Sequence, residues 1–308
     1  MNKKIRNFLN LIDIDKTSLR KILNRAASLK KKRLNLSQNI NSLKNINLAM
    51  IFEKPSTRTR VSFELAIQEL GGRAVILDET NTHLSRGETI ADTARVLSRY
   101  CNILMVRTNK HKKLMEYYDY SGLPVINGLS DKSHPCQILA DILTFEENKK
   151  NIENSKITWL GDVNNVLYSW MEAANIFKFN LRISYPKKIK IESFFNKMLN
   201  NKSKYISIIE DPIIAVKGSD CVVTDTWFSM GNKTSKKMVN MLKPYQVNKE
   251  IMSSANRNAI FMHCLPASRN NEVTTEIIED KKISVVWDEA ENRLHVQKAI
   301  LEWCLEKI

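Results

Sequence analysis

The densest cluster of chemically useful side chains is Ser56-Thr57-Arg58-Thr59-Arg60, which follows the apolar run Leu48–Phe52. Pro55 ends a strand there, and Ser56 is well placed as the N-cap of the helix that the next apolar residues predict. A helix start offers backbone N–H groups, and guanidinium groups grip anions in a fork geometry. The run lacks the glycines of a Walker A loop. We therefore predict an oxyanion site suited to phosphate; the alternative is an ordinary capped helix with two surface arginines.

Two later segments place further anion-binding side chains at the ends of apolar runs. Arg107 directly follows Ile103–Val106, where it is either a ligand or a surface ion-pair partner. His134 precedes Pro135, which biases His134 away from helix and lets Pro135 occupy the first helical turn. We therefore expect His134 and Gln137 at a helix N-terminus. A neutral histidine there donates a hydrogen bond to a carbonyl oxygen, whereas the alternative is a histidine that only caps the helix.

Two more motifs follow apolar runs in the second half of the chain. Asn165 ends the turn that begins at Gly161, which lacks the spaced glycines of a dinucleotide site, so we expect Asn165 as an amide ligand and no nicotinamide cofactor. Asp225 begins the motif Asp-x-x-x-Ser229-Met230-Gly. A carboxylate and a loop of this kind suit the ammonium group and the polar end of an amino acid. The alternative is a helix-capping Asp followed by an irregular loop.

The last motif is His263-Cys264-Leu265-Pro266. A thiol beside an imidazole suggests a nucleophile, but adjacent residues on a strand point to opposite faces, which disfavours a Cys–His dyad. We instead expect Cys264 to hydrogen-bond a substrate amine with help from Asp225. Arg293, near the start of the last predicted helix, is a third candidate for contact with an anion.

The elements that must position these residues alternate between strands and helices. Short apolar runs predict strands at Leu48–Phe52, Ala74–Leu77, Ile103–Val106, Pro124–Asn127, Ile157–Leu160, Leu181–Ser184, Tyr205–Ile208, Cys221–Thr224, Ile260–His263 and Val285–Trp287. Long helices are expected at about 135–150 and 290–306. This pattern predicts an α/β protein with two doubly wound parallel-sheet domains linked by long helices. The domains are 1–134 plus 290–308, and 135–289. Ligands of such sheets bind at the carboxyl ends of strands, where all the motifs lie.

The composition excludes several classes of protein. The chain has 308 residues with 8 Gly and 7 Pro, which argues against low complexity and long disordered linkers. No apolar run approaches the roughly 18 residues of a membrane span, and the N-terminus lacks the apolar core of a signal peptide. The five cysteines form no CxxC pair. We therefore expect no disulfides, no membrane association and a cytoplasmic protein.

The net charge of +15 is compatible with nucleic acid, an anionic substrate or a lysine-rich surface. The basic clusters contain no interleaved aromatic residues, which favours a solvated surface over nucleic-acid binding. A zinc site built from His134, Cys136, His263 and Cys264 is conceivable, but these residues lack the usual ligand spacing. We therefore expect neither a nucleic-acid partner nor a metal.

Four motifs, in this order and spacing, resemble those of the aspartate/ornithine carbamoyltransferase family: Ser56–Arg60, His134–Gln137, Asp225–Gly231 and His263–Pro266. The resemblance runs from Phe52 to the last helix and includes Asp92–Tyr100. The first motif is common to the family, whereas the last two are typical of its ornithine-specific branch. Relatives that act on acylated ornithine tend to carry Leu at the position of Thr57 and Lys at the position of His263.

The resemblance implies transfer of a carbamoyl group from carbamoyl phosphate to the δ-amine of L-ornithine, which gives L-citrulline and phosphate in arginine biosynthesis. Arg107 and His134 would polarise the carbonyl oxygen, while Cys264 and Asp225 would bind the amine. The implied carbamoyl phosphate contacts are Ser56, Thr57, Arg58, Thr59, His83, Arg107, His134, Pro135, Cys136, Gln137, Cys264, Leu265 and Arg293. The implied ornithine contacts are Asn165, Asp225, Ser229 and Met230. The resemblance assigns carbamoyl phosphate to the domain of residues 1–134 plus 290–308 and ornithine to the domain of residues 135–289. No metal or organic cofactor is implied.

Three positions depart from the family pattern. His83 stands where a Gln binds carbamoyl phosphate, in some members across a subunit interface, and Ser85 stands where Gly is usual. Ser268 stands where His is common. The family forms trimers or multiples of trimers, which we expect here. The rival functions are a carbamoyltransferase that uses putrescine or an acylated ornithine, and a non-enzymatic nucleic-acid binder.

Overall fold

The computed structural model describes residues 5–34, 40–78, 87–189, 191, 193–200, 203–227 and 236–308. The chain forms two compact units, Met1–Ala140 with Asn292–Ile308, and Asp141–Glu291. The divisions fall inside two helices, α5 (Pro135–Lys149) and α12 (Val286–Cys304), so each of these helices belongs to both units. The predicted domain boundaries at 134 and 289, with one substrate assigned to each domain, stay a prediction.

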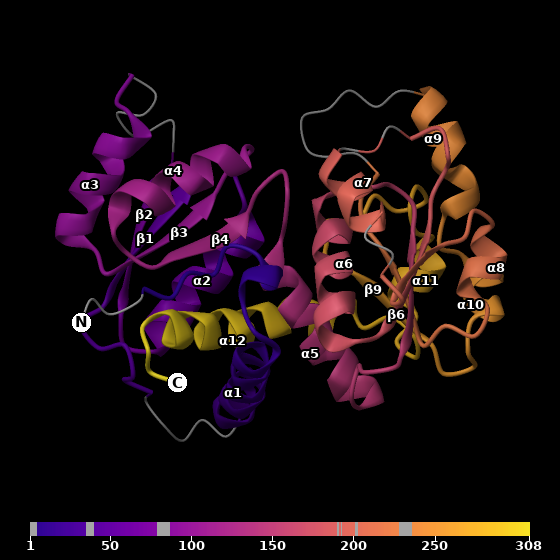
Figure 1. Cartoon of the computed structure of the whole chain (residues 1–308). Coiled ribbons are helices and arrows are strands. Elements are labelled where there is room, and N and C mark those ends of the chain that lie inside the picture. Colours follow the sequence, from indigo (N-terminus) through magenta and orange to yellow (C-terminus); the bar gives the residue numbers. More distant parts are fainter. Residues whose placement is uncertain are drawn as a thin grey trace. The chain divides into compact units, whose positions relative to one another are not determined.

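The first unit is built on a four-stranded parallel sheet of order β2-β1-β3-β4. Its strands are β1 (Asn47–Phe52), β2 (Arg73–Asp78), β3 (Ile103–Arg107) and β4 (Val125–Leu129). Its helices, besides parts of α5 and α12, are η1 (Leu11–Asp13), α1 (Lys16–Leu34), α2 (Thr57–Glu69), α3 (Ile90–Tyr100) and α4 (His111–Ser121). In Figure 1, α3 and α4 lie on one face of this sheet, and α2 and α12 lie on the other.

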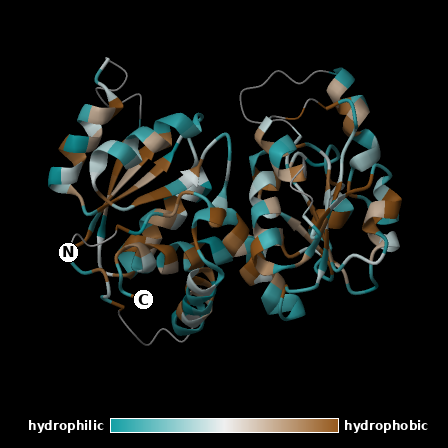
Figure 2. Cartoon of the chain, viewed as in Figure 1, coloured by the Kyte–Doolittle hydropathy of each residue, from teal (hydrophilic) through white to brown (hydrophobic). Residues whose placement is uncertain are grey.

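Burial on both faces explains the sequence of the central strands. All residues of β1 except the first are buried, as are the first four of β3, so these strands read as continuous apolar runs. Figure 2 shows the hydrophobic residues concentrated in the strands of each unit. α12 is fixed beside α1 by a buried carboxylate: Glu302 accepts hydrogen bonds from Arg25 at 2.5 and 2.7 Å and from Ser42 at 2.6 Å.

The second unit is built on a five-stranded parallel sheet of order β7-β6-β5-β8-β9. Its strands are β5 (Lys156–Leu160), β6 (Asn180–Ser184), β7 (Ile206–Ile208), β8 (Cys221–Thr224) and β9 (Ile260–His263). Its helices, besides parts of α5 and α12, are α6 (Asn165–Phe177), α7 (Ser193–Asn200), α8 (Pro212–Val216), α9 (Lys236–Leu242), η4 (Lys243–Tyr245), α10 (Lys249–Ser254) and α11 (Thr275–Glu279). Figure 1 shows α6 and α7 on one side of the sheet, with α8 and α10 on the other.

Each sheet contains a point where the strand order reverses. In the first unit the chain moves outward from β1 to β2, and then outward on the other side from β3 to β4. In the second unit the same reversal lies between β5 and β8. Loops leave such a point in opposite directions and open a crevice at the carboxyl ends of the two strands. The predicted parallel α/β architecture is confirmed. The motifs at Ser56, Arg107, Asn165 and Asp225 lie at or just after the carboxyl ends of the strands at the two reversal points, and those at His134 and Cys264 follow the neighbouring strands β4 and β9.

One predicted strand is wrong. Val285–Trp287 was expected to be a strand, but α12 begins at Val286. The pairing that remains is short: Phe261 of β9 donates to the carbonyl of Ile283 at 2.7 Å and accepts from Val285 at 3.1 Å. The run begins with apolar residues because Val285 pairs with β9 and Val286 joins the core. Periodicity does not distinguish such a run from a short buried strand. Among the described residues, no helix has the length and apolarity needed to cross a membrane.

Candidate functional site

The first half of the candidate site lies where β1 ends and α2 begins. Ser56 is extended, with φ −151°, and occupies the N-cap position that the sequence predicts, but its side chain makes no capping hydrogen bond. A cavity of about 410 Å³ opens here, lined by Lys54, Ser56, Thr57 and Arg60 among others. Hydroxyl and cationic groups therefore border a hollow at the N-terminus of a helix, where the helix dipole favours an anion.

The two arginines of the first motif have different surroundings. Arg60 is exposed and forms an ion pair with Asp78, at the end of β2, with an N–O distance of 3.4 Å. Arg58, two residues earlier, is half-buried. The sequence predicts two guanidinium groups at the anion site, and in the structure a carboxylate offsets the charge of one of them, Arg60. Asp78 also lines the cavity, and it was not among the predicted site residues.

Thr59 is the centre of a buried hydrogen-bond cluster. Its hydroxyl oxygen accepts from Arg107 at 2.8 Å and from Arg293 at 2.9 Å. Arg293 also donates to the side-chain oxygen of Gln137 at 2.6 Å. Thr59 has no exposed surface, Gln137 is 1% exposed and Arg293 is 4% exposed. The structure thus brings together four predicted side chains from α2, β3, α5 and α12, all within the first unit.

His134 lies in the electric field of this cluster. It is 3% exposed, and its pKa is held well below the usual value by burial and by the positive charges of Arg293 and Arg107. A histidine with a lowered pKa is neutral at physiological pH and carries one ring N–H. The predicted neutral histidine at a helix N-terminus is therefore electrostatically favoured. Two guanidinium groups and a neutral imidazole suit an oxygen that gains negative charge during a reaction.

Hydrogen bonds of the preceding residue hold the segment that carries His134 in place. Ser133, directly before it, donates to Asn10 at 2.8 Å and accepts from Asn127 at 3.0 Å. Burial raises the pKa of Cys136 to about 12, and its thiol points to the backbone carbonyl of Asn127 at 3.4 Å. Cys136 is thus a protonated, buried packing residue, and Pro135 opens α5 as predicted.

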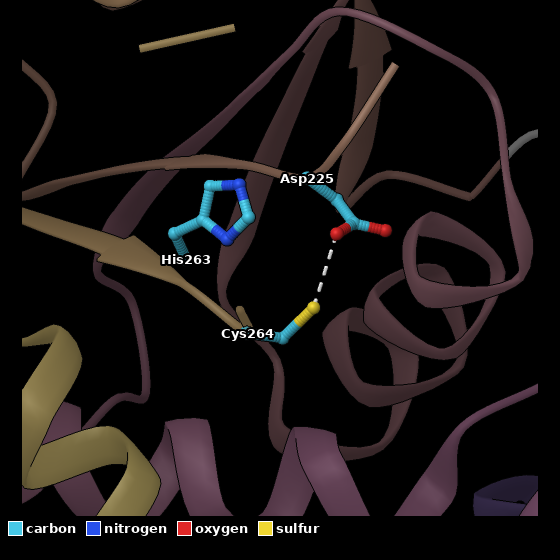
Figure 3. A group of neighbouring side chains, drawn as sticks. All are labelled: Asp225, His263 and Cys264. Atoms are coloured by element: carbon cyan, nitrogen blue, oxygen red, sulfur yellow. Dashed lines mark hydrogen bonds between the residues drawn. The ribbon is translucent and has the colours of Figure 1, made fainter. Parts of the chain in front are cut away.

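The second half of the candidate site lies in the other unit, where β5 and β8 end. Asp225 accepts a hydrogen bond from the side chain of Asn164 at 2.7 Å and one from the Cys264 thiol at 3.1 Å. Figure 3 shows the thiol directed at the carboxylate. Asn164 also caps α6, because its side-chain oxygen accepts from the backbone of Val166 at 3.0 Å and Leu167 at 3.1 Å. The capping amide therefore holds the carboxylate in place.

Asn164 is a residue that the sequence analysis passed over in favour of its neighbour Asn165. The signal was available, because an Asn directly before an apolar-periodic run is a strong N-cap candidate. Asn165 itself is the first residue of α6 and is half-buried. Asp162 was missed too: burial, together with the charge of Asp225, raises its pKa to about 6. The second half of the site thus contains two interacting carboxyl groups.

The Cys264 thiol is a poor nucleophile in this environment. Burial and the negative charges of Asp225 and Glu289 raise its pKa well above the ordinary value, so it stays protonated. A ring nitrogen of His263, the sulfur of Cys264 and a carboxylate oxygen of Asp225 lie within 4.8 Å of one another. Neighbouring residues within a strand would point to opposite faces, but β9 ends at His263, so Cys264 is free of this alternation. Both ring nitrogens of His263 already have partners, Leu265 and Glu272, whereas Cys264 and Asp225 are hydrogen-bonded to each other.

Three predicted contact residues lie outside the described residues: His83, Ser229 and Met230. The others divide between the two units. The first unit contains Ser56, Thr57, Arg58, Thr59, Arg107, His134, Pro135, Cys136, Gln137 and Arg293, and the second contains Asn165, Asp225, Cys264 and Leu265.

The fold and these residues define a two-unit α/β protein with a hydrogen-bonded arginine cluster in one unit and a carboxylate-centred polar cluster in the other. Residues 6–147 match the family described as aspartate/ornithine carbamoyltransferase, carbamoyl-P binding domain. Residues 153–304 match the Asp/Orn binding domain of the same family. The chain therefore belongs to the aspartate/ornithine carbamoyltransferase family.

Full-length relatives agree with this assignment. The chain is 49% identical to an ornithine carbamoyltransferase of Nitrobacter winogradskyi over 99% of both chains. It is 50% identical to one of Rhodopseudomonas palustris over 99% of this chain and 98% of the relative. Among solved structures, ornithine carbamoyltransferase from Pyrococcus furiosus superimposes with a TM-score of 0.92 at 42% identity over 98% of both chains.

The two hydrogen bonds that Thr59 accepts from arginines lead to a prediction. Thr59→Val keeps the shape of the side chain but removes the acceptor shared by Arg107 and Arg293. Because hydrogen bonds to charged groups contribute about 1.5–3 kcal/mol, we expect the affinity for inorganic phosphate to fall about tenfold or more. Isothermal titration calorimetry measures this loss, and Thr59→Ser, which keeps the hydroxyl, is the matched control. Equal phosphate affinity in the Val variant and the unmodified protein would show that the Thr59 hydroxyl does not organise an anion site.

Proposed function

We propose that this chain transfers the carbamoyl group of carbamoyl phosphate to the δ-amine of L-ornithine, giving L-citrulline and phosphate. The observation that carries the proposal is the buried cluster of Arg107, Thr59, Arg293 and Gln137 beside a neutral His134. The family assignment and the names of full-length relatives support the same reaction.

We assign carbamoyl phosphate to the first unit. Its phosphate lies at the N-terminus of α2, against Ser56, Thr57, Arg58 and Thr59, and its carbamoyl group lies toward Arg107 and His134. As the amine attacks, the carbonyl oxygen becomes an oxyanion. Preorganised donors stabilise such a charge because they are already oriented, and one donor typically contributes about 3–4 kcal/mol. Arg107 and the N–H of His134 take this role.

We assign ornithine to the second unit, where Asp225 supplies the negative charge that an amino acid's ammonium needs. The δ-ammonium, with an ordinary pKa of about 10.4, must lose a proton before its nitrogen attacks. A new C–N bond then forms at the carbonyl carbon, the bond from that carbon to the phosphate oxygen breaks, and the released phosphate takes the proton of the amine. The Cys264 thiol, protonated and bonded to Asp225, is a hydrogen-bonding group for the amine and not a nucleophile.

A panel of acceptors tests the proposal. Carbamoyl phosphate is supplied with ornithine, aspartate, putrescine or N-acetylornithine, and the carbamoylated product is measured. We expect turnover with ornithine alone, because putrescine has no carboxylate and an acyl group removes the α-ammonium that Asp225 pairs with. Turnover with another acceptor would keep the phosphate half of the proposal and overturn the assignment of Asp225. Absence of turnover with every acceptor would overturn the proposed reaction.

We further propose a cytoplasmic enzyme of arginine biosynthesis. All five cysteines are free thiols, four of them buried, which suits a reducing compartment. One similar structure is that of an anabolic ornithine carbamoyltransferase from Campylobacter jejuni, which is 40% identical with a TM-score of 0.89 over 99% of this chain and 100% of the other. This similarity supports the biosynthetic direction over the catabolic one.

We also propose that the protein assembles as a trimer or a multiple of trimers. β2 is an edge strand, and Val75 on it is 43% exposed. Val61 and Leu65 on the neighbouring α2 are 48% and 38% exposed. Exposed apolar side chains gathered near a sheet edge are typical of an interface. Light scattering should give a mass of three times 35.6 kDa or a multiple of it, whereas the mass of one chain would contradict the assembly.

A further inference from the structure

The His-Cys-Leu-Pro segment contains a backbone conformation that needs support. Leu265 has φ +57°, in the left-handed region that residues other than Gly, Asn and Asp rarely adopt. This residue directly follows Cys264, whose thiol contacts Asp225. The direction of the thiol therefore depends on how firmly the turn at Leu265 is held, and conformations of this kind persist where the surrounding structure fixes them.

His263 supplies part of that support. The backbone N–H of Leu265 donates to Nδ1 of His263 at 2.9 Å, so Nδ1 is an acceptor and the ring proton is on Nε2. Nε2 then donates to Glu272 Oε1 at 3.2 Å. The backbone N–H of His263 is fixed too, because it donates to Glu289 at 2.9 Å. The imidazole has no exposed surface, so each of these bonds is shielded from water.

Glu272 fixes the other end of the same turn. Its Oε1 also accepts a hydrogen bond from the backbone N–H of Ser268. One carboxylate oxygen thus links His263, before the turn, to Ser268, after it. Glu272 is itself anchored, because its carbonyl accepts from Val247 at 2.8 Å and Val247 in turn accepts from Thr274 at 3.0 Å. Its side chain is completely buried. The turn is thus held at both Leu265 and Ser268.

We propose that His263 and Glu272 are positioning residues, which hold the Cys264–Leu265 turn so that the Cys264 thiol stays directed at Asp225 and the acceptor amine. This inference rests on the proposed function for the role of the amine, but the geometry of the turn stands independently of it. The imidazole acts as a fixed bridge between the backbone N–H of Leu265 and the carboxylate of Glu272, which in turn accepts from Ser268, and it exchanges no proton during turnover.

Two substitutions of His263 separate its two bonds. In His263→Asn, the amide oxygen takes the position of Nδ1 and still accepts from Leu265, while the bond to Glu272 is lost. In His263→Gln, the amide nitrogen takes the position of Nε2 and still reaches Glu272, while Leu265 loses its acceptor. We expect the Gln variant to have the larger loss, with kcat about 10- to 100-fold lower and a raised KM for ornithine, because small misplacements of a reacting group have effects of this size.

Glu272→Gln tests whether the carboxylate acts by position or by charge. The amide oxygen of Gln still accepts from His263 and Ser268, so we expect a smaller loss than in His263→Gln and an unchanged shape of the pH profile of kcat. Glu279→Gln is the matched control. Glu279 also pairs with a residue of this segment, Arg269, at 2.5 Å, but this ion pair is exposed. This control should behave like the unmodified enzyme.

The reactivity of Cys264 provides a measurement that does not depend on the reaction. Cys264 is half-buried, whereas the other four cysteines are buried, so iodoacetamide labelling followed by peptide mass spectrometry reports on this turn. In the absence of substrates, His263→Gln should be labelled at Cys264 about tenfold faster than His263→Asn, since its turn has lost the bond to Leu265. Thermal unfolding of each variant confirms that the comparison is made on folded protein.

The outcomes distinguish the inference from the proposed function. If the unmodified protein carbamoylates no acceptor while the labelling rates follow the expected order, the proposed function fails and the positioning role stands. Equal labelling rates and equal kinetics in the Asn and Gln variants would overturn the positioning role. A changed pH profile in Glu272→Gln would overturn it too, because it would show that the pair carries a proton.

Discussion

One hydroxyl oxygen organises the first half of the site. Thr59 accepts from Arg107 and Arg293 at once, and these two residues come from β3 and from the C-terminal helix α12. Two guanidinium groups repel each other, so holding both at one point requires fixed acceptors and rigid elements. Three features meet this requirement. The strand order reverses between β1 and β3, Glu302 links α12 to α1, and Ser133 anchors the loop before α5.

The consequence for chemistry is an asymmetry between the two units. In the first, burial and the positive charges of Arg293 and Arg107 lower the pKa of His134, and the same charges favour anions. In the second, burial and neighbouring carboxylates raise the pKa of Asp162 to about 6 and the pKa of Cys264 well above its ordinary range. One unit thus stabilises developing negative charge, and the other suits a cationic amino acid. Pairs of environments that shift protonation in opposite directions are the usual basis for acid–base chemistry at neutral pH.

The sequence predicted the architecture because strand and helix periodicities are distinct and because each motif follows an apolar run. It placed Thr59, Arg107, His134, Gln137 and Arg293 in one site, although only the fold shows that Thr59 binds the two arginines. Asp162 and Glu272 were missed because their roles depend on tertiary neighbours, Asp225 and His263. The N-cap position of Asn164 was predictable from the sequence, but its bond to Asp225 was not. The strand predicted at Val285–Trp287 failed for a related reason: a short apolar run is buried equally well as the start of a helix.

The central claim is that burial and the two guanidinium groups of Arg293 and Arg107 keep His134 neutral, so that its N–H is available to an oxyanion. NMR of isotope-labelled histidine, assigned with a His134→Asn variant, measures the protonation of each of the five histidines directly. An ordinary histidine titrates near pH 6.5. Because burial and the two arginines lower the pKa of His134, its resonances should stay those of the neutral ring from about pH 5.5 to 8. A titration of His134 at or above about pH 6.5 would contradict the account.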